Sequence, residues 1–209
     1  MSYRHFFLIV LLMQDVLLHC CCAPCSSAII EWMLQNGYKP TLFYFNPNIF
    51  PDSEYLIRKN ELKRYARKWE LKVIDGDYDH AAWRDKVKGL ELEPERGARC
   101  QACFNYRLAQ AARIASQEHI ALFTTTLASS RWKDIEQIAR AGHLAESLYP
   151  DTKFWDKNWR KGGLQQRRNE LLKENHFYNQ LYCGCEFSMK RLDPQECERI
   201  LKQPTPAEI

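Results

Sequence analysis

The sequence predicts an α/β protein built on a parallel sheet with helices on both faces, and three observations support this fold class. Short apolar runs alternate with segments in which apolar residues recur at helical spacing, an order typical of strand–helix–strand units. The 209 residues are 45% hydrophobic and 27% charged, a balance suited to burying one core. Gly37 and the turn over residues 46–48 stand where such elements end.

Each element of the alternation has its own apolar pattern. Four strands are expected, at residues 15–21, 39–48, 71–77 and 120–130. Four helices follow these strands in turn, at residues 26–37, 52–70, 100–119 and 133–149. In a sheet of this kind the functional crevice lies at the carboxyl ends of the strands, so we expect the site where the first and fourth strands end.

The domain boundaries follow from changes in composition. Residues 13–191 are expected to form a single α/β catalytic domain, which from about residue 150 continues as a helical, cysteine-bearing extension. Residues 192–209 are expected to form a tail, disordered over 202–209. Residues 1–12 imitate a secretory signal, but the apolar run is short and no cleavage site follows it. We therefore expect a loose N-terminal extension, or a native start at Met13, on a cytoplasmic protein with no membrane partner.

A basic and aromatic segment covers residues 153–173. It carries seven Lys or Arg against two carboxylates, with Phe154, Trp155 and Trp159 among them, and the whole chain has a net charge of +4. Cations attract phosphates, and exposed aromatic rings stack on unpaired bases. The segment is therefore expected either to contact RNA or to form a solvated basic helix.

Nine cysteines carry the strongest chemical signal. They form three groups and one single residue: Cys20, Cys21, Cys22 and Cys25; Cys100 and Cys103; Cys183 and Cys185; and Cys197. An odd number with adjacent, C-x-x-C and C-x-C spacings fits a disulfide framework badly and fits metal or redox chemistry in a reducing cytosol. Cys20 and Cys197 are expected to be buried thiols without a chemical role.

The remaining seven cysteines are expected to converge. Cys100 and Cys103 begin a helix, where the backbone dipole favours thiolates, and Gly184 lets its two cysteine neighbours turn to one side. One zinc ion uses four thiolates. Seven suit an iron–sulfur cluster with four ligands plus a second redox element, which is either another iron or a dithiol formed by Cys183 and Cys185.

Four stretches resemble one protein family in the same order along the chain: "HCCCAPC", "CQACFNYRL", "TTTLASSRWKD" and "YNQLYCGCEFS". They look like the cobalamin-independent epoxyqueuosine reductases, the QueH family, from Val16 to Arg191. The resemblance implies an iron–sulfur oxidoreductase that removes the epoxide oxygen of epoxyqueuosine at the wobble position of tRNA, the last step of queuosine biosynthesis. It also implies a sheet similar to that of the adenine-nucleotide α-hydrolase (HUP) superfamily.

The resemblance also implies roles for individual residues. The family's [4Fe-4S] ligands match these four: Cys21, Cys22, Cys100 and Cys103. Cys183 and Cys185 match its C-x-C pair, a redox-active dithiol with a reversible disulfide bond or ligands of an adjacent mononuclear iron, which Cys25 would then join. Cys20 is an additional cysteine, so the register of the first group is open by one residue. The electron donor is not identified.

Opening and deoxygenating an epoxide takes two electrons and two protons, so proton donors are needed beside the cluster. Four polar residues in the family-like stretches are candidates for proton transfer or substrate contact: Tyr106, Arg107, Lys133 and Asp134. The plain alternatives are a core aromatic for Tyr106 and a surface ion pair for Arg107. His19, beside the first group, is expected to adjust it by hydrogen bonding.

Two other functions compete with the reductase. An ATP-dependent tRNA-modifying enzyme on the same sheet requires a Gly- or Ser-rich phosphate loop after the first strand, where this chain has thiols that repel phosphates. A zinc-stapled tRNA-binding module would use the same cysteines without redox chemistry. It predicts a colourless zinc protein, whereas the reductase predicts a brown one.

Overall fold

The computed structural model describes residues 13–209 and confirms the α/β fold class. Five strands form one sheet in the order β3–β2–β1–β4–β5, and every neighbouring pair is parallel. The strands are β1 (Gln14–Cys20), β2 (Tyr38–Tyr44), β3 (Val73–Asp75), β4 (Leu122–Thr125) and β5 (Lys153–Phe154). Because the chain leaves β1 toward β2 and returns on its other side as β4, the strand order reverses at the carboxyl ends of β1 and β4. The predicted N-terminal extension and its signal-like run lie outside the described residues.

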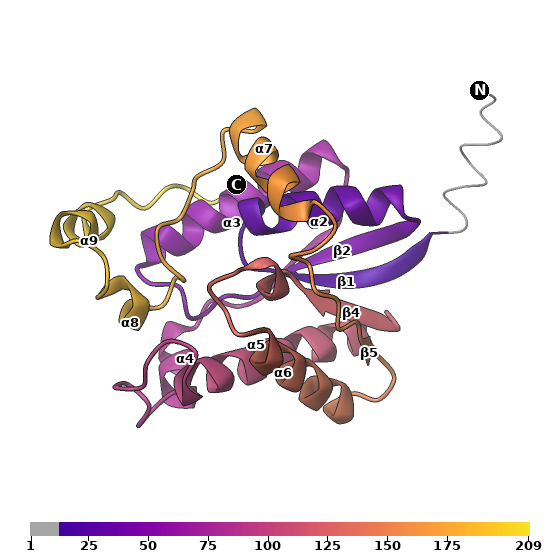
Figure 1. Ribbon diagram of the computed structural model, residues 1–209, viewed down its shortest axis with the longest axis horizontal. Helices are drawn as coiled ribbons and strands as arrows, with labels where there is room; N and C mark the ends of the chain where they lie inside the picture. The colour runs from indigo at the N-terminus through magenta and orange to yellow at the C-terminus, as the bar shows by residue number, and fades with distance from the viewer. Residues whose placement is uncertain (1–12) are drawn as a thin grey trace.

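Helices cover both faces of the sheet, as predicted (Figure 1). One face carries α2 (Ala23–Gln35), α3 (Asp52–Lys68) and α7 (Leu164–Glu174). The other carries α4 (His80–Lys86), α5 (Ala98–Gln117) and α6 (Ile135–Leu148). Two short helices, α8 (Glu186–Met189) and α9 (Pro194–Leu201), lie at the opposite end of the molecule from the start of β1. No helix in the described part of the chain is long and apolar enough to cross a membrane.

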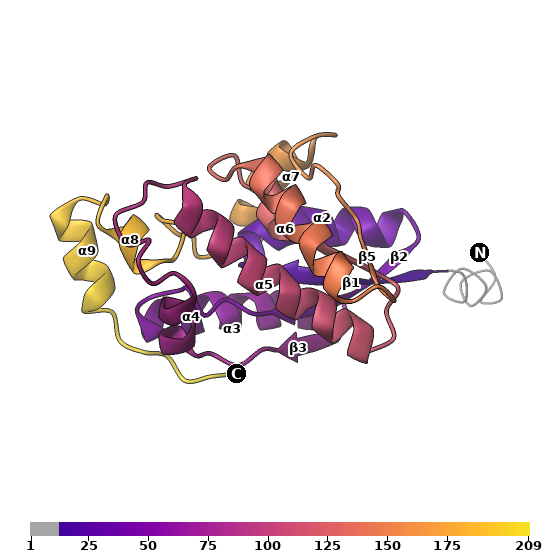
Figure 2. The same cartoon turned by 90° about the horizontal axis from the view of Figure 1, so that it is seen from below.

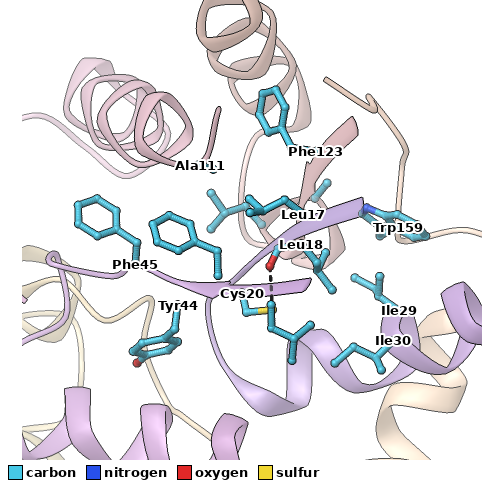
Figure 3. Close-up of a cluster of buried hydrophobic side chains, with 14 of the residues drawn as sticks. Leu17, Leu18, Cys20, Ile29, Ile30, Tyr44, Phe45, Ala111, Phe123 and Trp159 are labelled. Carbon is cyan, nitrogen blue, oxygen red and sulfur yellow. Dashed lines mark hydrogen bonds between the residues drawn. The ribbon is translucent and has the colours of Figure 1, made fainter. Parts of the chain in front are cut away.

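The core encloses β1 and buries the first cysteine of the first group. Figure 3 shows Leu17, Leu18 and Cys20 among buried side chains from both helical layers and the neighbouring strands. The Cys20 thiol is fully buried and donates a hydrogen bond to the Leu18 carbonyl at 3.3 Å, and burial raises its pKa far above the ordinary value. Cys20 is thus the predicted buried thiol. The other three cysteines follow β1: Cys22 is buried, and Cys21 and Cys25 are half-buried.

Helix α2 begins earlier than the sequence predicted. Cys22 is its N-cap and Pro24 lies in the first turn, where a proline costs no hydrogen bond. Cys25 therefore lies on the helix and not on a loop. Helix α4 and the short edge strand β5 were not predicted, because neither has a sustained apolar period.

The prediction of exposed aromatic residues over 153–173 is wrong. Trp159 is fully buried and Phe154 is 8% exposed, and both belong to the core. The Lys157 ammonium lies 4.1 Å from the ring centroid of Trp32, where it covers the aromatic cluster. Arg167 pairs with carboxylates of α2 and α7. The segment closes the edge of the sheet, so these rings are not free to stack on bases.

The C-terminal tail is ordered in the structure, contrary to the predicted disorder. After α9 the chain runs back across α3 and ends near β3 (Figure 2). The Asn60 side chain donates to the Ala207 carbonyl at 2.7 Å, and Lys59 lies 2.8 Å from Glu208 and 2.5 Å from Asp75. The contacts that hold this tail are polar. A prediction from hydrophobicity therefore could not detect that it packs against α3. Cys197, expected to be buried, is half-buried, and its thiol donates to the Met189 carbonyl.

Candidate functional site: two groups of thiols at the carboxyl ends of the strands

The first thiol group is built by the turn from β1 into α2. Cys21 and Cys22 follow the last residue of β1, and Cys25 lies one turn into α2. The three sulfur atoms lie within 4.8 Å of one another, with Cys21 Sγ and Cys22 Sγ 3.9 Å apart. A spacing of this kind suits sulfur ligands that share one metal centre.

Two polar side chains that the sequence did not single out bind this group. Thr126, directly after β4, accepts a hydrogen bond from the Cys21 amide at 3.0 Å and donates to its sulfur at 3.3 Å. The Gln180 amide nitrogen lies 2.9 Å from the Cys22 sulfur and 3.8 Å from the Cys25 sulfur. Thr126 could have been found from its place at the end of the strand beside β1. Gln180 comes from a distant loop, and only the fold shows its position.

The electrostatics single out Cys21 as the most acidic thiol of the first group. Hydrogen bonds with the Cys22 and Cys25 thiols, aided by Lys133 and Thr126, outweigh burial and hold the pKa of Cys21 well below its ordinary value. Burial raises the pKa of Cys22. Hydrogen bonding to Cys21 raises the pKa of Cys25 to about 11. A thiolate at Cys21 therefore forms first, and thiolates are the species that bind metals.

The second thiol group brings together the C-x-x-C and C-x-C pairs. One small pocket is lined by Cys100, Cys103, Cys183, Cys185, Asn48, Trp83, Arg99 and Phe104. Burial raises the pKa of Cys100 to about 11 and that of Cys185 to about 12. The Arg96 amide donates a hydrogen bond to the Cys100 sulfur at 3.3 Å. Without a cation Cys100 and Cys185 are protonated, and a bound metal would displace their protons.

The C-x-C loop is held from behind by a buried ion pair. Arg58 and Glu54 of α3 are 3% and 0% exposed and lie 2.7 Å apart. The Arg58 guanidinium also donates to the carbonyls of Tyr182 and Cys183, both at 3.3 Å. Gly184 has φ +117°, and a Cβ atom there would lie 2.9 Å from Ile49 Cγ1 and 3.0 Å from the Arg58 guanidinium. Glycine is thus required for both cysteines to face the same pocket.

Lys133 is influenced by the charges of both thiol groups. Burial opposes its charge, but Cys183, Cys21 and Cys25 outweigh burial and raise its pKa above the ordinary value. None of the ion pairs between residues 13 and 209 involves Lys133. The groups that favour the charge of its ammonium are therefore cysteines from both thiol groups.

Arg107 is buried behind the thiols and is not the surface ion pair that one alternative predicted. Its side chain is 2% exposed and donates to the Asn46 amide oxygen. Burial raises the pKa of Cys103, and the Arg107 guanidinium opposes that rise. Burial and Arg107 together lower the pKa of His19. His19 is fully buried, and its pKa is lowered to about 3. Its ring nitrogens form hydrogen bonds with the Thr125 hydroxyl and the Phe45 carbonyl. A buried guanidinium paired with no carboxylate in the described chain favours negative charge on the neighbouring sulfur atoms.

Tyr106 and Asp134 lie at the margin of the site. The Tyr106 ring packs edge-on against the Phe45 ring, with the ring centroids 5.5 Å apart, and the Lys86 ammonium lies over it. Burial raises the pKa of Tyr106. Asp134 is the N-cap of α6 and accepts hydrogen bonds from two backbone amides of its first turn, at 2.8 and 3.2 Å. Its carboxylate thus positions the helix that follows Lys133.

Ten buried polar atoms of the described chain lack a hydrogen-bond partner, and four of them belong to residues around the cysteines: Asn48 Oδ1, Trp83 Nε1, Arg107 Nε and Gln180 Oε1. Nearly all buried polar groups in proteins are paired, so unpaired atoms beside a site are compatible with a bound group there. Cys21, Cys22 and Cys25 are the thiols of the described chain whose sulfur atoms lie close enough to share one metal ion. These thiols, with Lys133 and Arg107 outside every ion pair of the described chain, fit a thiolate-bound metal.

These features define an α/β protein with a candidate metal-binding or redox-active thiol site at the reversal of its sheet. The chain belongs to the family of epoxyqueuosine reductase QueH, whose model matches residues 16–191. The epoxyqueuosine reductase QueH of Histophilus somni is 49% identical over 168 residues, which cover 80% of this chain and 69% of the relative. Those of Acinetobacter baylyi and Thermotoga maritima are 47% and 37% identical, covering 80% and 70% of this chain and 77% and 78% of the relatives.

Proposed function

We propose that this chain is an epoxyqueuosine reductase, which converts epoxyqueuosine to queuosine in tRNA. The observation that carries the proposal is that the family match, residues 16–191, contains both thiol groups and Lys133. The reaction breaks two carbon–oxygen bonds of the epoxide and forms a carbon–carbon double bond. Two electrons and two protons are consumed, and the oxygen leaves as water.

We further propose that Cys21, Cys22, Cys100 and Cys103 hold a [4Fe-4S] cluster. The low pKa of Cys21, the unpaired cations and the unpartnered polar atoms support an anionic group at this place. When bound, such a cluster supplies electrons one at a time. The assignment takes two cysteines from each thiol group and therefore requires the loop after β1 and the start of α5 to serve one centre.

Cys183 and Cys185 are assigned to the second redox element, and two versions remain. As a dithiol they would give two electrons and close to a disulfide. As metal ligands they would bind a mononuclear iron together with Cys25, whose sulfur lies within 4.8 Å of the two cluster cysteines beside it. Both versions use the rigid loop that Arg58 holds in place.

Polar side chains of the chain itself are assigned to proton donation, charge stabilisation and positioning. Lys133 holds a proton on Nζ beside both thiol groups, so we assign it the protonation of the departing oxygen. Arg107 stabilises negative charge on the sulfur atoms from behind. Tyr106 is proposed as a substrate contact one turn after Cys103 on α5. Asp134 is proposed to act through its cap on α6, which positions Lys133.

Cellular placement follows from the thiols. Because nine unpaired cysteines persist only under reducing conditions, we place the protein in the cytoplasm, with tRNA as its partner and a cellular reductant as its electron donor.

The test is an anaerobic assay with tRNA that carries epoxyqueuosine and with dithionite as the reductant. Digested nucleosides are separated and weighed by mass spectrometry. The proposal predicts a product lighter by one oxygen atom, formed by the wild-type protein and absent with Cys103→Ala. Unchanged epoxyqueuosine with an iron-loaded wild-type protein would contradict it. A zinc-loaded, colourless protein that binds the tRNA would favour the zinc-stapled module instead.

A further inference from the structure

The chain carries one exposed tryptophan, and it lies at the rim of the thiol site. Trp132 is 69% exposed, whereas the five other tryptophans are buried or half-buried. Trp132 immediately precedes Lys133, which neighbours both thiol groups. The preceding turn contacts the first group directly, since the Ser129 hydroxyl lies 3.4 Å from the Cys25 carbonyl.

The backbone around Trp132 is pinned by two arginines. Arg96 donates to the carbonyls of Trp132 and Arg131 at 3.0 and 3.3 Å. The same Arg96 has a backbone φ of +65° and binds the Cys100 sulfur through its amide, so it ties the loop to the second thiol group. A non-glycine residue in this strained conformation is typical of functional sites.

Arg160 pins the loop from the other side. Its guanidinium donates to the carbonyls of Ser130 and Lys133. Hydrogen bonds thus hold the loop backbone on both sides, while the indole of Trp132 is left in solvent. Such preorganisation reduces the entropy lost when a flat ligand stacks on the ring.

The surroundings of the ring are cationic. Arg131 lies over the Trp132 ring at 5.0 Å, and burial together with the charge of Arg96 lowers the pKa of Arg160. Asp134 is the acidic group that faces Arg160. No ion pair in the described chain involves Arg96, Arg131 or Arg160. Three cations that face one carboxylate favour a polyanionic partner.

We propose that Trp132 is a stacking platform for an unpaired base of the anticodon loop, with Arg131 contacting the adjacent phosphate. This proposal rests on the proposed function, because it assumes that the substrate is a wobble nucleotide in tRNA. A stacked neighbouring base would hold the modified nucleotide at the thiol site beside Lys133. The proposal assigns to Trp132 the base stacking that the sequence analysis offered for the aromatic residues within 153–173.

The test measures binding of a fluorescein-labelled anticodon stem–loop RNA to the full-length, anaerobically purified protein by anisotropy. Trp132→Ala should weaken binding about tenfold, and Trp132→Phe, which keeps an aromatic face, should stay within about threefold of wild type. Arg131→Gln should lower the slope of log Kd against log salt by about 0.7. Leu148→Ala removes another exposed apolar side chain, 58% exposed at the far end of α6, and should change nothing.

The control RNA is the same stem closed into a continuous duplex. Equal affinity of Trp132→Ala and wild type for the stem–loop would overturn the proposal, and so would an equal loss on the duplex. A stem–loop preference that depends on Trp132 in a protein without reductase activity would support the platform and contradict the proposed function. If the protein is an active reductase and Trp132→Ala changes neither its RNA affinity nor its KM, the proposed function is supported and the stacking platform is contradicted.

Discussion

The two thiol groups of this protein are assembled in different ways. The first is local: a strand ends at Cys20, a helix begins after Cys22, and the turn between them brings three sulfur atoms together. The second joins the start of α5 to a loop about eighty residues further along the chain (an interval counted from Cys103 to Cys183). That loop is placed by Arg58, Glu54 and the conformation of Gly184. The first group therefore depends on secondary structure, and the second on long-range packing.

The largest effect is expected from the first group itself. Cys21→Ser should leave less than about a tenth of the wild-type iron, because it removes the thiol that ionises first. The matched control is its neighbour: Cys20→Ala should keep its iron and lose roughly 1 kcal/mol of folding free energy from a small core cavity. Iron content and urea denaturation measure the two results. Equal iron loss in both variants would place the register one residue earlier.

Gly184→Ala tests the second group. The new Cβ would meet Ile49 and Arg58, so the C-x-C loop must shift, and turnover should fall about 100-fold. Gly89→Ala is the control, since Gly89 also has a positive φ of +82° but nothing within 4 Å of its Cβ position. It should lose about 1 kcal/mol of stability and keep its turnover. Comparable turnover losses in both variants would show that backbone strain alone, and not the loop position, is responsible.

Arg58→Lys tests how the C-x-C loop of the second thiol group is held, and a smaller effect is expected than for Gly184→Ala. Lysine keeps the charge beside Glu54 but lacks the planar fork that reaches both loop carbonyls, so stability should fall by about 2 kcal/mol. Arg199→Lys, in an exposed pair with Glu196, should change stability by less than about 0.5 kcal/mol. Urea denaturation measures both. An Arg58→Lys protein as stable as wild type would mean that the loop is held by other contacts.

The smallest effect concerns Asp134 and separates capping from proton transfer. Asp134→Ala should cost about 1 kcal/mol because α6 loses its N-cap, and Asp134→Asn, which caps equally well, should restore stability. If capping is its role, Asn should also restore the single-turnover rate that Ala lowers. A slow but stable Asn variant would instead identify the carboxylate as a proton donor.

The contrast between a locally built first thiol group and a second group built by long-range packing also explains what the sequence could predict. The strand–helix alternation and the first group are encoded within short stretches, so the sheet, its helices and the buried Cys20 follow from local patterns. Gln180, Arg58 and Glu54 act across the fold and carry no local signal. The prediction for residues 153–173 failed because Trp159 and Phe154 are buried where the segment closes the sheet. Strand β5 could not be predicted, because two residues are too few to show a hydrophobic period.

The central proposal is that four of the seven thiols, Cys21, Cys22, Cys100 and Cys103, hold an iron–sulfur cluster. It is tested most directly by purifying the full chain without oxygen and assaying iron, zinc and acid-labile sulfide beside the visible spectrum. The account predicts a brown protein with about four iron and about four sulfide per chain, and iron above that value if Cys25, Cys183 and Cys185 bind a further ion. A colourless protein with stoichiometric zinc and no sulfide would contradict it.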